Sequence, residues 1–347
     1  RCEILAMTKT IQDIDAVIYD PPLVSTKTVQ SIENERANPE YLSIGIKPFG
    51  TDFVMARKSK VIGLLGDTSQ GKTSLMIHMA REMAGQLDTQ KNEIGLFVTW
   101  EDNIEDFGMV DIANVSKIPV KSLYNGQVKD GEFSRMLNAA AKRAQTPLWL
   151  AGHSELSETR PMLTMSDIFM VCANLIHKQG KTIKFIMLDY LQRINREDTK
   201  ERDTRMQFVK IMDMVKNLAL SYRTCVFIGS QVRRDMVEKM GKDRQPQTHW
   251  AMETSNFEHS CDGMMSVWMP YMSKDIYKLG DSLEAKTGVE AKPITVTKEL
   301  MSIQILKQKK GETGTRAFVD FIPEYGMFVD YGTAAQVRAE ILRENAK

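Results

Sequence analysis

The chain has 347 residues, with 46 Lys and Arg against 45 Asp and Glu, and therefore a formal net charge of +1. An apolar fraction of 42% beside 26% charged residues is ordinary for a folded protein and excludes wholesale disorder. No apolar run approaches the roughly 20 residues of a membrane span, and we find no secretory signal, so we expect a cytoplasmic protein without a membrane partner. The four cysteines form no C-x-x-C pair and the five histidines have no metal-binding spacing, which argues against zinc. The near-zero charge means that any nucleic-acid contact must come from local basic patches.

The N-terminal part is expected to be a short extension followed by one helix. Asp20-Pro21-Pro22-Leu23 should break the chain, and residues 25–36 have the pattern of a short helix with Val29 and Ile32 on one face. Asn38-Pro39 should end this helix, and the glycines and proline between residues 45 and 50 mark a loop.

From residue 60 onward, strand-like runs alternate with helical patterns. The strand-like runs cover residues 61–65, 94–99, 147–151, 183–188 and 225–229, and the helical patterns cover residues 75–83, 130–145, 165–178 and 203–222. This alternation predicts an α/β fold whose central sheet is mostly parallel and flanked by helices. Two further strand-like runs at 302–306 and 316–322 predict a closing β-hairpin near the C-terminus. Residues 335–345 could form a helix or a frayed tail.

A phosphate-binding loop follows the first of these strands. The run Gly66-Asp67-Thr68-Ser69-Gln70-Gly71-Lys72-Thr73 matches G-x-x-x-x-G-K-[ST] completely, with a strand before it and a helix after it that includes Ser74. The glycines allow successive backbone N–H groups to point at phosphates, and the helix N-terminus adds partial positive charge. We expect Lys72 to reach the β- and γ-phosphates of ATP and Thr73 to bind Mg²⁺.

Two polar residues end neighbouring strands and are candidates for hydrolysis. Asp189 follows the run 183–188, where a parallel strand delivers its side chain to the ligand crevice, so we expect it to contact Mg²⁺. Gln231 leaves the run 225–229 at the same edge, where a neutral amide can contact the terminal phosphate. The amide alone is a weak signal.

A third candidate, Glu101, has two interpretations. It follows the run 94–99 at the expected ligand edge, where a carboxylate can polarise the attacking water. Three more acids follow at once (Asp102, Glu105 and Asp106), so a solvated acidic turn fits the sequence equally well.

Four further segments carry a resemblance to a known family. They are I-M-L-D-Y-L-Q at 186–192, F-I-G-S-Q at 227–231 with Arg233 and Arg234 after it, L-Y-N-G-Q at 123–127, and I-L-K-Q-K-K-G-E-T-G at 305–314. In this order and spacing they resemble the replicative hexameric helicases of the DnaB type and the helicase half of phage primase–helicases. The phosphate-binding loop alone would fit many ATPases, but the D-Y-L-Q, S-Q and K-Q-x-x-G-x-x-G set is much more specific. The resemblance covers roughly residues 22–331.

The resemblance implies a RecA-like ATPase fold and assigns a role to each matching residue. It makes Glu101 the catalytic glutamate, Asp189 the magnesium-coordinating acid and Gln231 the sensor of the terminal phosphate. Lys307 and Lys309 would belong to a finger that enters the nucleotide site of the neighbouring subunit.

The resemblance also implies an organisation and an assembly. We expect an N-terminal extension at residues 1–21, a linker helix and loop for subunit docking at 22–44, the ATPase domain at 45–331 and a C-terminal tail at 332–347. The implied assembly is a homo-hexamer with ATP sites at subunit interfaces and single-stranded DNA in a central channel.

The DNA contacts are expected on loops that face this channel. The candidates are Arg193 and Arg196 after the Asp189 strand, Arg233 and Arg234 after the Gln231 strand, and Glu253 in the segment that matches the family's DNA-contacting loop. Acidic residues are interspersed in these loops, so a solvated charged surface explains any single cation nearly as well.

Three departures from the family pattern bear on function. Lys309 stands where the family has a finger arginine, and lysine lacks the planar five-donor fork. Met252 and Ser255 stand where the DNA-contacting loop normally carries arginine and glycine, which predicts weaker or different DNA contacts. Only about twenty residues precede the linker, so docking of a primase through an N-terminal helical domain is not expected.

The sequence therefore supports one main hypothesis and two alternatives. The main one is an ATP-driven ring motor that translocates on single-stranded DNA and unwinds duplex DNA in phage or mobile-element replication. The departures instead favour a DnaB-derived ATPase that acts as a nucleotide-gated assembly or recruitment module with a protein partner. A RecA-like recombination filament fits less well, because the D-Y-L-Q and K-Q-K-K-G segments point away from it.

Overall fold

The computed structural model describes residues 19–37, 40–50, 53, 56–157, 162–233, 236, 243–251, 255–273, 276–283 and 293–345. The contacts within the chain divide it into two compact units, residues 1–41 and residues 42–347.

The first unit contains helix α2, Pro21–Ala37. The Asp20 carboxylate accepts a hydrogen bond from the backbone N–H of Leu23 (2.9 Å), and both prolines fall in the first turn, where a helix needs no N–H donor. The break expected at residues 20–23 is therefore wrong, because this segment begins the helix. No side chain of α2 is buried, and its larger apolar side chains are all exposed, namely Leu23, Val24, Val29 and Ile32.

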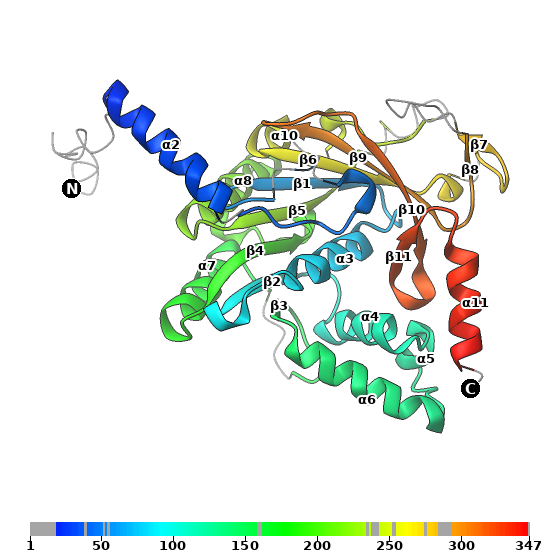
Figure 1. Cartoon of the computed structure of the whole chain (residues 1–347). Coiled ribbons are helices and arrows are strands. Elements are labelled where there is room, and N and C mark those ends of the chain that lie inside the picture. Colours follow the sequence, from blue (N-terminus) through cyan, green and yellow to red (C-terminus); the bar gives the residue numbers. More distant parts are fainter. Residues whose placement is uncertain are drawn as a thin grey trace. The chain divides into compact units, whose positions relative to one another are not determined.

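The second unit is built on a nine-stranded sheet with the order β11-β10-β9-β6-β1-β5-β4-β2-β3 (Figure 1). Its strands are β1 (Val61–Gly66), β2 (Glu93–Thr99), β3 (Leu148–Ala151), β4 (Thr182–Asp189), β5 (Cys225–Gln231), β6 (Gly263–Trp268), β9 (Leu300–Gln308), β10 (Arg316–Ile322) and β11 (Met327–Asp330). The strands from β6 to β3 in this order are parallel, whereas β9, β10 and β11 are antiparallel to their neighbours. A separate small sheet pairs β7 (Ser282–Leu283) with β8 (Ile294–Thr295).

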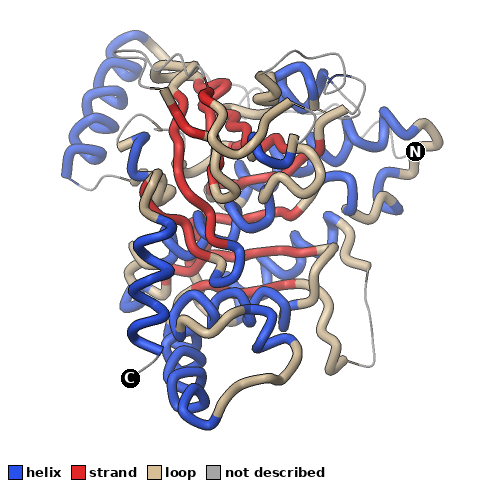
Figure 2. The backbone as a smooth tube through the Cα atoms, turned by 90° about the vertical axis from the view of Figure 1, so that its right-hand side faces the viewer, coloured by secondary structure: helices blue, strands red, loops and turns tan. Residues whose placement is uncertain are grey.

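Helices cover both faces of this sheet (Figure 2). They are α3 (Lys72–Ala84), α4 (Ile104–Ser116), α5 (Val120–Tyr124), α6 (Asp130–Gln145), α7 (Met165–Ala173), α8 (Thr204–Ser221), α10 (Ser255–Ser260) and α11 (Ala334–Asn345). Side chains alternate between the faces of a strand, so Ile62 and Leu64 of β1 join the core around α3, while Val61 and Leu65 join the core around α7 and α8. The mostly parallel α/β sheet predicted from the alternation of elements is confirmed.

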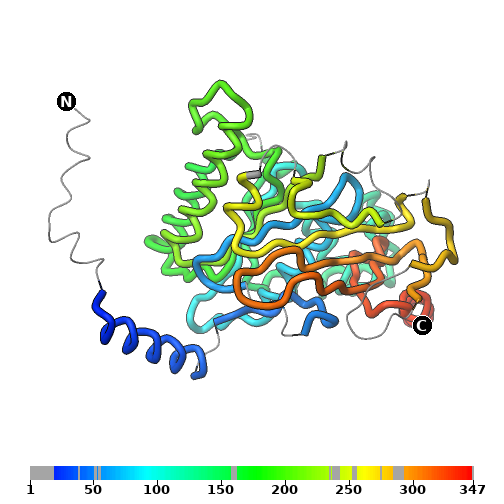
Figure 3. The backbone as a smooth tube through the Cα atoms, turned by 90° about the horizontal axis from the view of Figure 1, so that it is seen from above, coloured from blue at the N-terminus to red at the C-terminus, as the bar shows by residue number. Residues whose placement is uncertain are grey.

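The closing hairpin is also confirmed, and it extends the sheet. β9 pairs antiparallel with both β6 and β10, so β9, β10 and β11 form one side of the sheet, next to β6 (Figure 3, orange beside yellow). Residues 334–345 form the helix α11, and its Ile341 packs with Ile322 and Tyr325 in a small buried cluster. Of the two alternatives for this segment, the helix is the one observed.

Two elements near the nucleotide site were not expected. β6 contains the run Met264-Met265, and methionine occurs in helices and strands alike. The hydrophobic pattern of this segment therefore does not distinguish a strand from a helix. α4 begins at Ile104, within the acid-rich segment, and the Asp106 carboxylate accepts a hydrogen bond from the Asn103 backbone N–H (3.3 Å) at its N-terminus. An acidic residue in the first turn stabilises a helix. The acid-rich segment is therefore compatible both with a turn and with the start of a helix.

Candidate nucleotide-binding site

The register of the parallel strands brings four strand ends together. Gly66 at the end of β1 lies opposite Gln231 of β5, and Thr99 at the end of β2 lies opposite Asp189 of β4. β4 and β5 are also neighbours. Because parallel strands share a carboxyl edge, the phosphate-binding loop, Asp189, Gln231 and the segment after β2 meet at one edge of the sheet.

A cavity of about 470 Å³ lies at this edge. It is lined by Asp67, Thr68, Ser69, Gly71, Lys72, Thr73 and Ser74 from the loop and α3, by Glu101, Asp102, Tyr190 and Gln231 from the neighbouring strand ends, and by the apolar residues Met269, Met272, Phe321 and Pro323. The loop residues, Glu101 and Gln231 were predicted to lie at this site, whereas Asp102 and Tyr190 were not. The apolar residues were not predicted either, because they come from segments that are remote in sequence. A cavity with one polar and one apolar part suits a nucleotide, which has a charged tail and a flat base.

The phosphate-binding loop has the conformation that its motif requires. Gly71 has φ +76°, the left-handed region, and a Cβ there would meet the Met301 side chain at 2.5 Å. Gln70 does not line the cavity, and its buried side-chain oxygen accepts a hydrogen bond from the Met269 backbone N–H (2.7 Å). This bond ties the loop to the end of β6. Burial lowers the pKa of Lys72, although the nearby Asp189 and Glu101 act to raise it.

Asp189 is the fully buried acid of the site. Its side chain is 0% exposed, and neither carboxylate oxygen has a hydrogen-bond partner of standard geometry among the described residues. Burial raises its pKa to about 6, although the Thr73 hydroxyl close to it and Lys72 act in the opposite direction. A buried carboxylate without partners is costly unless a ligand completes it. This chemistry fits Mg²⁺, which commonly binds through one or two carboxylates together with substrate phosphates.

The acid-rich segment after β2 divides into two pairs. Glu105 accepts hydrogen bonds from the Ser154 hydroxyl and from the Glu155 backbone N–H, and Asp106 stabilises the start of α4. Glu101 and Asp102 instead line the cavity. Burial raises the pKa of Asp102, and Glu101 beside it adds to this effect. The geometry therefore places Glu101 where a catalytic carboxylate is expected.

The D-Y-L-Q segment connects the site to β5. The Gln231 side-chain nitrogen donates to the Tyr190 hydroxyl (2.9 Å), and the Lys72 ammonium lies 4.9 Å from the Tyr190 ring centre. Gln192 accepts a hydrogen bond from the Gln231 backbone N–H (3.2 Å) and donates to the Ser230 hydroxyl (3.1 Å). Tyr190 thus contacts both the predicted sensor and the predicted phosphate-binding lysine. Its place in the D-Y-L-Q signature was the signal that could have identified it.

Lys309 lies at the opposite edge of the sheet. β9 ends at Gln308, which pairs with Gly263 at the start of β6, whereas the phosphate-binding loop follows the far end of β1. The Lys309 ammonium contacts the Asp262 carboxylate at 2.7 Å, and the Lys307 ammonium donates to a backbone carbonyl at Glu258 (2.5 Å). Both predicted finger residues therefore make contacts within their own chain.

Asp262 is buried and has several hydrogen-bond donors around it. Its Oδ2 accepts a hydrogen bond from the Val61 backbone N–H (3.0 Å) and contacts Lys216, while its Oδ1 contacts Lys309. Burial acts to raise the pKa of Asp262, but these donors outweigh it and hold the pKa at about 2.

The predicted DNA contacts have different surroundings. Arg193 is 56% exposed and contacts Glu101, whereas the Arg196 guanidinium lies 5.3 Å from the Phe208 ring centre. Arg233 is exposed at the end of β5, where its backbone N–H bonds the Trp250 carbonyl (2.9 Å). Arg234, Met252 and Glu253 lie outside the described residues, and Ser255 begins α10.

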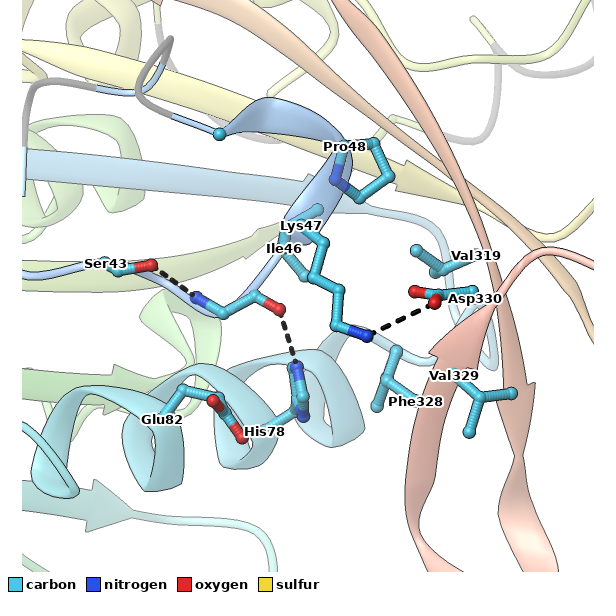
Figure 4. Close-up of a pocket in the computed structure, with 12 residues that line it drawn as sticks. Ser43, Ile46, Lys47, Pro48, His78, Glu82, Val319, Phe328, Val329 and Asp330 are labelled. Carbon is cyan, nitrogen blue, oxygen red and sulfur yellow. Dashed lines mark hydrogen bonds and ion pairs between the residues drawn. The ribbon is translucent and has the colours of Figure 1, made fainter. Parts of the chain in front are cut away.

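A second cavity of about 330 Å³ lies against the middle of α3, away from the phosphate-binding loop (Figure 4). Lys47 and Asp330 pair across it at 3.2 Å, and His78 lies 3.3 Å from the Gly45 carbonyl. Burial lowers the pKa of His78 to about 4, so this ring is neutral at pH 7. With its lysine paired and its histidine neutral, this cavity does not offer the phosphate-binding groups of the first one.

The N-terminal end of the second unit is held on α3 beside this cavity. We call residues 42–46 the strap. Gln86 bonds both the N–H (2.9 Å) and the carbonyl (2.8 Å) of Ser43 in the strap. Gly45 has φ +74°, and a Cβ there would meet the Glu82 side chain at 2.2 Å, so the strap lies directly against the helix.

Within the described ranges, no group of three or more His, Cys, Asp or Glu is arranged to hold a metal ion. Among the helices of the part that the structure describes, none is long and apolar enough to cross a bilayer.

Comparisons with known proteins agree with the geometry. The family model of the DnaB-like helicase C terminal domain matches residues 51–330. Among solved structures, one ATPase domain aligns with a TM-score of 0.70 at 16% identity, covering 90% of this chain and 99% of that one. The structure of a DnaB-like replicative helicase and its interactions with primase aligns with a TM-score of 0.70 at 17% identity, covering 94% of this chain and 72% of that one. At these identities the structures support the fold alone. No curated protein matches the chain in sequence.

Proposed function

Because the chain belongs to the family of DnaB-like helicase C-terminal domains, and is thus a replicative helicase-type ATPase, we propose that it forms a hexameric ring motor on single-stranded DNA. The motor would use ATP and Mg²⁺ to translocate and to unwind duplex DNA in replication, in a phage or mobile-element setting. The observation that carries this proposal is the meeting of Lys72, Glu101 and Gln231 around a cavity of nucleotide size, with the buried Asp189 at the same sheet edge.

Each residue at this edge has a defined task in the proposed reaction. Lys72 and the loop N–H groups bind the β- and γ-phosphates. Thr73 and Asp189 would hold Mg²⁺, which would neutralise charge on the phosphates. Glu101 orients the attacking water and accepts its proton. Gln231 contacts the terminal phosphate through its amide, and the Tyr190 hydroxyl holds that amide in place.

The position of the finger supports an assembly. Lys309 follows β9 at the sheet edge opposite to the cavity, so it is remote from the nucleotide of its own chain. In the proposed ring it serves the nucleotide site of a neighbouring copy. Its single ammonium would stabilise the transition state less well than an arginine fork.

The linker helix supports the same assembly. α2 has no buried side chain, although Val29 and Ile32 lie three residues apart on one face. We assign this face to a neighbouring copy in the ring, because packing of an apolar face contributes most of a helix's stability.

One observation favours the alternative function. Lys307 and Lys309 both make contacts within their own chain, and a finger held in this way would catalyse weakly in trans. The chain would then be an ATPase that assembles in response to nucleotide and recruits a replication protein, with little or no unwinding.

A single set of measurements separates the two functions. ATP hydrolysis is measured with and without single-stranded DNA, on particles whose oligomeric state is imaged by electron microscopy, and fork unwinding is measured in parallel. Lys72→Ala removes the phosphate-binding lysine and should abolish hydrolysis, whereas Lys91→Ala removes an exposed lysine as the matched control. ATP-dependent rings that hydrolyse ATP without DNA stimulation or unwinding would reject the motor and support the assembly module.

A further inference from the structure

Arg193 contacts the predicted catalytic carboxylate. Its terminal nitrogen Nη2 lies 3.6 Å from Oε1 of Glu101, and its Nε donates a hydrogen bond to the Tyr190 hydroxyl (3.3 Å). Glu101 and Tyr190 line the nucleotide cavity, but Arg193 does not. The carboxylate is therefore drawn toward a cation that lies outside the cavity in which it would act.

The Tyr190 hydroxyl makes this contact part of a larger arrangement. It accepts hydrogen bonds from both Arg193 and Gln231, so one oxygen joins the cation to the predicted sensor. A change in the position of Arg193 therefore alters the surroundings of two cavity residues, Glu101 and Gln231. Glu101 follows β2, Tyr190 and Arg193 follow β4, and Gln231 ends β5. These three strands are neighbours in the sheet.

The contact has the properties of a reversible restraint. The two side chains are 56% and 41% exposed, so water screens the pair and little free energy is needed to separate it. The Glu101 oxygen Oε1 faces the Arg193 guanidinium. On that side it cannot also accept a hydrogen bond from the attacking water. The pair thus opposes the role of Glu101 without blocking nucleotide binding at Lys72.

Arg193 also lies where a polyanion can compete for it. It ends the short helix Leu191–Arg193, which follows β4 on the loop expected to face DNA. An arginine fork pairs with a phosphate as readily as with a carboxylate, and often through two hydrogen bonds. A DNA phosphate that binds Arg193 would release Glu101 toward the cavity.

We propose that Arg193 is a positioning residue that restrains Glu101, and that a single-stranded DNA phosphate removes this restraint by taking over the guanidinium. This inference rests on the proposed function for the identity of the polyanion. The restraint itself concerns only side chains of this chain and can be tested without DNA.

The test compares Arg193→Ala with two other variants of the full chain. Arg193→Lys keeps the charge but loses the Nε donor to Tyr190, and Arg343→Ala removes an exposed arginine on α11 as the control. For each variant, kcat and KM for ATP are measured without DNA and with oligo-dT. Binding of fluorescein-labelled oligo-dT is measured by anisotropy, and thermal melts confirm that every variant is folded.

We expect Arg193→Ala to raise the DNA-free kcat by about twofold to fivefold, with KM for ATP unchanged, since exposed ion pairs of this kind have effects of that size. The stimulation by oligo-dT should shrink by a similar factor. Arg193→Lys should lie between the wild type and the alanine variant, and Arg343→Ala should match the wild type. A role confined to folding would not raise kcat.

The outcomes distinguish this inference from the proposed function. If oligo-dT stimulates the wild type but Arg193→Ala leaves the DNA-free kcat unchanged or lower, the restraint is rejected and the motor stands. If Arg193→Ala raises the DNA-free kcat but the wild type neither binds oligo-dT nor responds to it, the restraint stands and the motor function is rejected.

Discussion

Two buried aspartates lie at opposite edges of the same sheet and have opposite surroundings. Asp189, at the carboxyl edge of β4, has no hydrogen-bond partner of standard geometry among the described residues, and burial raises its pKa to about 6. Asp262, at the start of β6, contacts two lysines and a backbone N–H, and these donors hold its pKa at about 2 despite burial. The two residues are 0% and 1% exposed, so exposure to solvent does not distinguish them.

This difference is the one we expect between an acid that binds a ligand and an acid that stabilises the fold. The fold itself supplies the partners of Asp262, so this residue joins β1, α8 and the end of β9. The fold gives the Asp189 carboxylate no hydrogen bond of standard geometry among the described residues, as we expect of an acid that a ligand completes. Replacing each aspartate by asparagine, one at a time, tests this difference.

The largest effect is expected for Asp189→Asn. A neutral amide would bind Mg²⁺ less well than a carboxylate, so hydrolysis should fall by about 10²–10³-fold, the loss typical of removing one preorganised electrostatic group. The substitution also removes a buried charge without partners, so the melting temperature should stay level or rise. A coupled ATPase assay and a thermal melt measure both. Turnover at the wild-type rate would contradict the assignment of Asp189 as the magnesium ligand.

Asp262→Asn should act on stability. The amide leaves Lys216 and Lys309 facing a neutral group, and we expect a loss of about 1–3 kcal/mol in the free energy of unfolding. This is less than for a fully buried pair, because the lysine side chains are 30% and 54% exposed. Urea unfolding measures it, with the m-value checking that the transition stays the same. An unchanged midpoint would show that the two lysines do not stabilise the fold.

The two acids should also give opposite dependences on pH. The folded-state pKa of Asp262 lies below 3.8, so its stabilising contribution is present above pH 3.8 and is lost as the pH falls toward 2. The folded-state pKa of Asp189 lies above 3.8, so its contribution to stability increases as the pH falls from about 6 to 3.8. The free energy of unfolding is measured from pH 2 to about 6. Asp262→Asn should abolish the loss of stability at low pH, and Asp189→Asn should abolish the gain of stability between pH 6 and 3.8. If a variant keeps the pH dependence of stability that it is expected to lose, another titratable group causes that dependence.

The smallest effect in the series is expected for Asp330→Asn. Asp330 pairs with Lys47 at 3.2 Å, but the two side chains are 60% and 79% exposed, so the pair should contribute no more than about 0.5 kcal/mol. Urea unfolding under the same conditions as for Asp262→Asn provides the comparison. A loss as large as that of Asp262→Asn would mean that exposure does not decide the contribution of these ion pairs.

The sequence predicted the features that depend on local pattern. The phosphate-binding loop needs glycine at fixed positions between a strand and a helix, and the strands around it are continuous apolar runs, so Lys72 and Asp189 could both be placed in advance. Glu101 could be placed only at the correct edge. Its role depends on how its acidic neighbours are used, and the hydrogen bonds of Glu105 and Asp106 become visible only in the fold.

What the sequence did not predict depends on contacts between remote segments. Asp262 and Lys309 are 47 residues apart and meet only because β9 folds back antiparallel onto β6. Phe321 and Pro323 reach the nucleotide cavity because β10 continues the same sheet. Tyr190 lies within a recognised signature, but its two hydrogen-bond donors come from its own loop and from the neighbouring strand.

The strap also has a mechanical consequence. Its Ser43 bonds the Gln86 side chain just after α3, its Gly45 carbonyl lies 3.3 Å from His78 within α3, and its Leu42 N–H bonds the Ala56 carbonyl just before β1. A tensile load that enters the second unit at residue 42 is therefore divided between α3, the helix that begins with Lys72 and Thr73, and the segment that leads into β1. Because β1 and α3 lie at the two ends of the phosphate-binding loop, pulling on the strap acts on both ends of that loop.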